Sequence, residues 1–121
     1  MKFMLLLAHD PGAWDSVTQA DKERGLNGHM ALIEQLTAQG KRIDSRRLRP
    51  TAQAKTVRFK HGKPIATDGP FSETKEVLGG YYLIECASMD EAIEWAKKVP
   101  PFGDPEHSSV EVRPVWERED Y

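Results

Sequence analysis

Two segments of this 121-residue chain are apolar on both faces of the strand that each predicts, and this feature most constrains the fold. Residues 2–8 read Lys-Phe-Met-Leu-Leu-Leu-Ala, and residues 80–87 read Gly-Tyr-Tyr-Leu-Ile-Glu-Cys-Ala. Successive side chains of a strand point to opposite faces of the sheet. Both faces of a sheet built on these two strands must therefore be covered.

The first helical pattern covers residues 16–39 and ends at Gly40, which stands where a C-cap glycine belongs. Gly25 and Gly28 each weaken its middle by about 1 kcal/mol relative to alanine. We therefore expect its first part to be a separate turn or a kinked start. The predicted inward side holds Met30, Ile33, Leu36 and Thr37.

The second helical pattern opens on a capping box, with Ser88 at the N-cap and Glu91 three residues later. Lys97 and Lys98 complement the helix dipole in the last turn, and the proline pair at 100–101 ends the helix. Its predicted inward side holds Ala92, Ile93, Ala96 and Val99. Two tryptophans, Trp95 on this helix and Trp116 near the chain end, are expected to be packing anchors.

The remaining patterns are shorter. Residues 41–49, 54–60, 63–67 and 109–117 predict strands, with His61-Gly62 as a hairpin turn between the second and the third. Pro114 favours an edge position for the last strand, and Ser72–Leu78 predict a short helical turn capped by Ser72. The order predicts one α+β domain over residues 1–121, a ferredoxin-like split βαβ arrangement with an inserted β-hairpin.

Two helices can cover only one face of such a sheet. The opposite face would leave a large apolar area open, which is rare on a soluble monomer. A second copy of the same sheet, packed face to face around a two-fold axis, would cover it. We therefore expect a homodimer in which two sheets form a dimeric α+β barrel.

Composition excludes several classes of protein. A net charge of −2 argues against nucleic acid as the main partner. The single cysteine, Cys86, allows neither a disulfide framework nor a cysteine-based zinc site, and the histidine spacing predicts no metal. No stretch is long enough to span a bilayer, and the apolar run at residues 3–8 is too short for a signal peptide, so we expect a cytoplasmic protein.

The motif richest in polar chemistry follows the predicted hairpin. Asp68-Gly69-Pro70-Phe71 leads into Ser72-Glu73-Thr74-Lys75-Glu76, and loops of this kind on a rigid strand often carry ligand sites. Phe71, Ser72 and Lys75 are candidate substrate-binding residues. Alternatively, Asp68 braces the turn and the charges that follow stand in water. Gly79-Gly80 lacks the context of a phosphate-binding loop.

His29, on the first helix, is the candidate acid–base residue, because a histidine at a helix–sheet cleft can exchange protons near neutral pH. With Asp68 in reach it would form a catalytic pair; alternatively, it closes the edge of the core through a backbone hydrogen bond. Alternation places Arg47 and Arg49 on one face of their strand and Arg42 and Arg46 on the other. If one pair turns into the cleft it could hold a small anionic ligand, and Arg47 and Arg49 are the candidates, unless the run is simply the solvated face of an edge strand. His9 could join the same site.

The Asp68–Glu76 motif, the Gly79-Gly80-Tyr81-Tyr82-Leu83-Ile84-Glu85 strand and the closing Val110-Glu111-Val112-Arg113-Pro114 resemble the YCII-related, or DGPF-domain, proteins over nearly the whole chain. The resemblance implies the dimeric α+β barrel superfamily, which includes muconolactone isomerase-like enzymes and small monooxygenases. It also implies a helix histidine and an aspartate as an acid–base pair, here matched to His29 and Asp68. Some relatives are associated with extracytoplasmic-function sigma factors.

Two functions from different classes follow. The first is a small-molecule enzyme without an organic cofactor, which performs proton transfer, isomerisation or elimination with His29 as base or acid, Asp68 as its partner and an arginine as the anion holder. The second is a binding or regulatory module that takes up a small ligand, or docks on a protein, without turnover. A solvent-reachable His–carboxylate pair in a cleft of substrate size would favour the enzyme.

Overall fold

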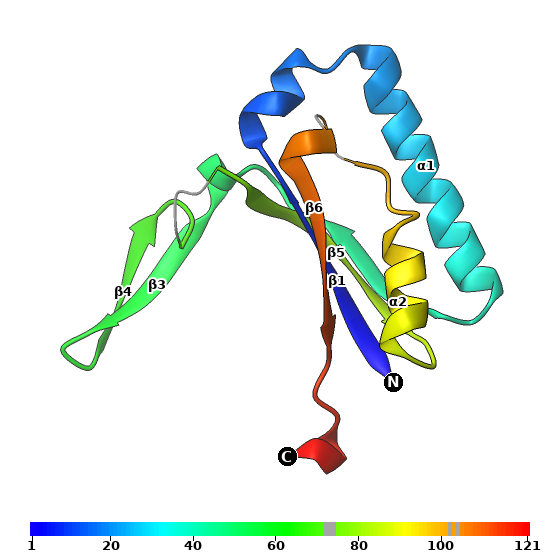
Figure 1. Ribbon diagram of the computed structural model, residues 1–121. Helices are drawn as coiled ribbons and strands as arrows, with labels where there is room; N and C mark the ends of the chain where they lie inside the picture. The colour runs from blue at the N-terminus through cyan, green and yellow to red at the C-terminus, as the bar shows by residue number, and fades with distance from the viewer. Residues whose placement is uncertain (72–74, 102, 104) are drawn as a thin grey trace.

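The core of the molecule is a four-stranded antiparallel sheet with both long helices on one face (Figure 1). The computed structural model describes residues 1–71, 75–101, 103 and 105–121. The sheet has the order β2-β5-β1-β6, which is the ferredoxin-like arrangement predicted from the sequence. Its elements are β1 (Lys2–His9), α1 (Gln19–Ala38), β2 (Arg42–Arg47), β5 (Val77–Glu85), α2 (Met89–Ala96) and β6 (Ser108–Pro114). Short 3₁₀ helices lie at η1 (Pro11–Ser16), η2 (Thr51–Gln53), η3 (Pro105–His107) and η4 (Arg118–Asp120).

The two central strands are apolar on both faces, as their alternation predicts. On the helix side, Phe3 and Leu5 of β1 and Ile84 of β5 are almost completely buried. By strand alternation Leu6 and Leu83 point to the other face, and both are half-buried. Figure 1 shows both helices on the opposite face of the sheet. One face of the sheet thus lies under the helices, while the other is only partly covered.

Helix α1 starts later than its pattern predicts. Thr18 is the N-cap, and its hydroxyl accepts the amide of Asp21 at 3.1 Å, so the preceding residues form η1 as a separate turn. Leu32 and Leu36 are buried, but Met30 is 55% exposed and Thr37 is exposed, so the predicted inward side was partly wrong. A spacing of four residues keeps Leu32 and Leu36 on one stripe, which leaves Met30 at its edge.

One glycine of α1, Gly28, is explained by the packing of the helix. A Cβ at Gly28 would lie 2.7 Å from Cγ of Pro100, so the glycine lets the helix approach the segment after α2. At the helix end, Gly40 has φ +69°, and the next amide, that of Lys41, donates to the carbonyl of Leu36 at 2.8 Å. This αL glycine ends α1 as predicted.

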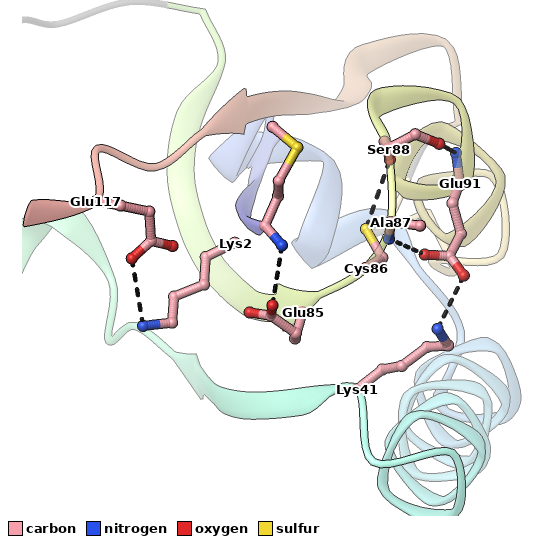
Figure 2. A network of polar contacts seen from close by, with 9 residues as sticks. Lys2, Lys41, Glu85, Cys86, Ala87, Ser88, Glu91 and Glu117 are labelled. Carbon is pink, nitrogen blue, oxygen red and sulfur yellow. Dashed lines mark hydrogen bonds and ion pairs between the residues drawn. The ribbon is translucent and has the colours of Figure 1, made fainter. Parts of the chain in front are cut away.

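Helix α2 begins at the predicted cap, with one difference. The Ser88 hydroxyl accepts the Glu91 amide at 3.2 Å, but the Glu91 carboxylate accepts the amide of Ala87 at 2.7 Å. The same carboxylate accepts a hydrogen bond from Lys41 at 2.8 Å, which ties the start of α2 to the end of α1 (Figure 2). Its buried side holds Ala92 and Trp95, followed by Val99 beyond the helix end, whereas Ile93 is 37% exposed, contrary to the prediction.

The inserted hairpin forms a sheet of its own. Strands β3 (Lys55–Lys60) and β4 (Lys63–Asp68) pair only with each other and extend away from the core as an arm (Figure 1). His61 and Gly62 have φ of +53° and +78°, as a two-residue turn with left-handed residues requires. The amide of Gly69 donates to the carbonyl of Ala54 at 2.8 Å, so the arm leaves the core and returns to it at one point.

Two boundaries differ from the sequence prediction. Val77 and Leu78 belong to β5, where they pair with His9 and Ala8 of β1, so no helical turn reaches Leu78. Residues 72–74, including the proposed cap Ser72, lie outside the described residues. The last strand, β6, is an edge strand as predicted and ends at Pro114.

Trp116 was expected to anchor the core, and this expectation was wrong. It is 69% exposed and packs edge-on against Tyr121, with ring centroids 6.1 Å apart. It lies beyond the end of β6 and so has no strand position facing the helices. Trp95, the other predicted anchor, is buried in the core. In the part of the chain that the structure describes, no helix is long and apolar enough to cross a bilayer.

Candidate functional site

A cavity of about 590 Å³ lies between the first half of α1, the sheet and η1. This volume is typical of small-molecule sites. Apolar side chains provide much of its wall, namely Leu7, Val17, Leu26, Met30 and Ile33. Two histidines, His9 and His29, the buried Tyr82 and the cation Arg47 also line it.

His29 is the central polar residue of the cavity. Helix α1 carries it over β5, where its Nδ1 lies 2.6 Å from the hydroxyl of Tyr82 and the two rings lie nearly parallel. Burial is the main cause that lowers the pKa of His29, and the nearby charge of Arg47 lowers it further. Burial also raises the pKa of Tyr82 to about 12. At neutral pH both groups are therefore uncharged.

The proton in this hydrogen bond can be assigned from the chemistry of the two groups. A phenol O–H is more acidic than the N–H of a neutral imidazole, and an imidazole nitrogen is the better acceptor. We therefore assign Tyr82 as the donor and Nδ1 of His29 as the acceptor. Neutral His29 then carries its own proton on Nε2, because the bond made by one ring nitrogen sets the state of the other.

Positive charge gathers around one tryptophan of η1. The ammonium of Lys22 lies 4.6 Å from the ring centroid of Trp14, and the guanidinium carbon of Arg47 lies 5.0 Å from it. Two of the cations that line the cavity are paired with carboxylates: Arg24 lies 2.8 Å from Asp21, and Arg46 lies 3.1 Å from Asp44, which the strand register places on the other face of the sheet. The excess positive charge of the cavity rests on the remaining two, Lys22 and Arg47. The cavity therefore combines an apolar wall with an excess of positive charge.

His9 stands at the end of β1, where the pairing with β5 is irregular. Leu7 pairs with Gly80 and Ala8 pairs with Leu78, so Gly79 is an extra residue in β5, a β-bulge. A Cβ at Gly79 would lie 2.4 Å from Cε1 and 2.5 Å from Nδ1 of His9. The imidazole thus occupies the space that any larger residue at position 79 would fill.

At Gly80 the backbone of the neighbouring strand comes too close for any side chain. A Cβ there would lie 2.8 Å from the carbonyl oxygen of Arg46, in the neighbouring strand β2. The adjacent glycine, Gly79, accepts the amide of Leu48 at 2.9 Å through its carbonyl. The glycine pair therefore brings β2, and with it Arg47, close to β5 and the cavity.

The structure brings together only some of the predicted site residues. His29 and Arg47 line the cavity, whereas Asp68, Arg49, Phe71 and Lys75 do not. Arg49 follows β2 and is exposed, Lys75 is exposed, and Ser72 lies outside the described residues. The residue that the structure places in hydrogen-bonding contact with His29 is therefore Tyr82.

Asp68 instead belongs to the base of the arm. Its side chain is 88% exposed and forms an ion pair with Lys55 on the opposite strand. Gly69 has φ +93°, and its carbonyl accepts the hydroxyl of Thr56 at 2.7 Å. These contacts join the end of β4 and the start of the turn to the opposite strand of the arm, β3.

Phe71 completes this turn on the arm. The guanidinium of Arg58, on β3, donates to the carbonyl of Phe71 at 2.6 Å and lies 4.9 Å from the centroid of its ring. The ring itself is 74% exposed. Phe71 therefore fastens the end of the motif to the arm, away from the cavity wall.

No group of three or more histidine, cysteine, aspartate or glutamate side chains in the described part of the chain could hold a metal ion. The polar residues that the sequence reasoning missed are Tyr82, Trp14 and Lys22. Tyr82 was assigned only to an apolar strand, because its partner lies 53 residues away. The one usable signal was the pair Gly79-Gly80, which marks a close approach of other groups to the strand.

The fold and the cavity define an α+β protein of the ferredoxin-like type, with a charged site between its first helix and its sheet. The chain belongs to the YCII-related family: the family model described as the YCII-related domain matches residues 1–119. An uncharacterized protein of Rhizobium meliloti (strain 1021) is 37% identical over 115 residues, which cover 95% of this chain and 92% of the relative.

Proposed function

We propose that this protein is a small-molecule enzyme that moves a proton on a small organic anion bound in the cavity between α1 and the sheet. The observation that carries the proposal is the contact of 2.6 Å between His29 and Tyr82 in the wall of a cavity of substrate size. An apolar wall with excess positive charge favours a ligand with a hydrocarbon body and a carboxylate. Arg47 is the proposed anion holder, because a guanidinium binds a carboxylate through two parallel hydrogen bonds.

The reaction proposed is proton transfer, as in an isomerisation. Removing a proton next to a carbonyl or carboxylate places negative charge on oxygen, and donors already aimed at that oxygen stabilise the charge. Arg47 and the Nε2–H of His29 are two such donors. The proposed reaction uses no organic cofactor, since the proton leaves and returns within one molecule.

We further propose that the protein acts as a homodimer in which the uncovered faces of two sheets pack together. The centre of this face is apolar, with Leu6 and Leu83 half-buried. The strand register places Asp44 and Arg46 of β2 at one side of it, where the hydroxyl of Tyr81 donates to Asp44 at 2.8 Å. An apolar centre with a polar rim is typical of protein interfaces.

The test of the proposed function has two stages. First, thermal shift is measured with but-3-enoate, 2-oxobutanoate and phenylacetate, and with the uncharged amide of each. A ligand that binds only the folded state raises the melting temperature, so we expect the carboxylates to raise it and the amides to leave it unchanged. Arg47→Gln should weaken carboxylate binding roughly tenfold or more, whereas Arg49→Gln, outside the cavity, should not.

Second, exchange of carbon-bound hydrogen for deuterium in the bound acids is followed by proton NMR in D₂O. We expect wild-type protein to accelerate exchange, and His29→Gln to reduce the rate about 100-fold, the loss typical of removing one donor to a developing oxyanion. Tyr82→Phe should reduce it as well, because the proton on Nε2 is then no longer fixed. Binding without any exchange would contradict the enzyme and would support the alternative, a ligand-binding module without turnover.

A further inference from the structure

We propose that His9 is the base of this site and that His29 is the hydrogen-bond donor to the oxygen that becomes negative. The inference rests on the proposed function and divides its chemistry between two imidazoles. It also narrows the substrate to a small carboxylate whose acidic C–H stands next to a carbonyl or a double bond, so that the charge can spread onto oxygen.

The first argument is the state of His29. Nδ1 of His29 lies 2.6 Å from the hydroxyl of Tyr82. With Tyr82 assigned as the donor, the neutral ring has its proton on Nε2 and no lone pair left to accept one from carbon. A neutral imidazole in this state is a hydrogen-bond donor, the role that neutral histidines play where burial or a dipole keeps them uncharged. The base must then be another group in the cavity.

The second argument is the position of His9. It is the other imidazole that lines the cavity, and the bulge at Gly79 makes room for its ring beside β5. Bulges often occur next to active sites, where they redirect a side chain. Of the described carboxylates, only Asp21 lines the cavity, and it accepts a hydrogen bond from Arg24 at 2.8 Å.

The third argument is charge. Burial is the main cause that lowers the pKa of His9. The charge of Arg47 lowers this pKa further, and the charge of the adjacent Asp10 raises it. His9 is therefore neutral at pH 7 and able to accept a proton. Around the cavity, Arg24 is paired with Asp21 and Arg46 is paired with Asp44, so the excess positive charge is that of Lys22 and Arg47, and a bound carboxylate would offset part of it. The bound anion would thus raise the basicity of His9 when the proton is taken.

The proposed step is balanced within one molecule. The nitrogen of His9 takes the proton from carbon, and the C–H electron pair forms a carbon–carbon double bond while the carbonyl or carboxylate oxygen gains the negative charge. The Nε2–H of His29 and the guanidinium of Arg47 bind that oxygen. The imidazolium of His9 then returns the proton to another carbon of the conjugated system, which regenerates neutral His9 and gives the isomer.

The test compares four variants in the deuterium-exchange assay with but-3-enoate and 2-oxobutanoate. His9→Gln removes the proposed base, and Gly79→Ala keeps the histidine but places a methyl group where its ring lies. We expect both to lower the exchange rate at least tenfold while the affinity for the acid changes less than threefold. His29→Gln should lower it too. His61→Asn, at the exposed turn of the arm, is the matched control and should exchange at the wild-type rate.

A second readout does not depend on turnover. Nitrogen NMR of the imidazole rings should show His29 protonated on Nε2 at pH 7, with this state lost in Tyr82→Phe. Melting curves show whether His9→Gln and Gly79→Ala remain folded. If both are folded and exchange deuterium at the wild-type rate, while His29→Gln is slower, the assignment of His9 is overturned and the proposed function stands. His29 protonated on Nδ1 would overturn the division of roles, and wild-type protein without exchange would overturn both proposals.

Discussion

A histidine beside a phenol in an apolar wall is a different chemical group from a histidine in water. Burial is the main cause that lowers the pKa of His29, so the ring is neutral at neutral pH. Its contact with Tyr82 involves Nδ1, which leaves Nε2 as the nitrogen that we assign the proton. The sequence could place His29 at the helix–sheet cleft, because its neighbours follow the helical period. It could not identify Tyr82 as the partner, because that contact depends on how α1 lies across β5.

The lowered pKa of His29 predicts a pH-dependent stability. The unfolded chain, with a histidine near its ordinary pKa, binds more protons than the folded chain once the pH falls through about 6.5. Folding stability should therefore decline as the pH falls from 7 to 5, until the folded pKa is reached. In His29→Gln, urea denaturation should show a smaller difference in the free energy of unfolding between these two pH values. An unchanged difference would contradict the buried neutral histidine.

Elements whose signals are local were predictable. The N-cap of α2, the glycine after α1 and the two-residue turn of the arm each need only a few adjacent residues, and each is present. The start of β5 was not predictable, because Val77 and Leu78 become strand by pairing with a segment almost 70 residues earlier. For the same reason the sequence did not show which glycines serve packing and which do not.

Three glycines therefore predict opposite effects of the same substitution. A Cβ at Gly25 meets nothing within 4 Å, so Gly25→Ala should stabilise the protein by about 0.5–1 kcal/mol through the better helix propensity of alanine. Gly28→Ala must move Pro100, and Gly80→Ala must push β2 away, which should cost about 1–3 kcal/mol. Chemical denaturation measures all three. Stabilisation by Gly80→Ala would show that the two strands do not need their close approach.

At the scale of the whole molecule, the predicted topology is present, including the hairpin inserted between the second and third core strands. The sequence argument that two helices cover only one of the two apolar faces agrees with the folded chain, in which both helices lie on one face of the sheet (Figure 1); the partner subunit stays a prediction. What could not be predicted is the place of the Asp68 motif. It was expected to join His29, but it follows an arm whose direction no local pattern indicates.

The proposed homodimer predicts different effects of two surface substitutions. Leu6→Arg places a charge at the centre of the uncovered sheet face and should convert dimer to monomer in size-exclusion chromatography with light scattering. Phe59→Ser removes an apolar side chain of the arm that is 78% exposed, and it should leave the dimer intact. Loss of the dimer only in Phe59→Ser would place the contact on the arm, and a monomeric wild type would contradict the proposal.

The two ends of the arm meet at its base, where the amide of Gly69 donates to the carbonyl of Ala54, and in the described part of the chain its strands pair with each other and not with the main sheet. The register of the four core strands is set by the pairs β2–β5, β5–β1 and β1–β6 alone, so a longer or shorter arm would leave that register, and the cavity lining built on it, in place.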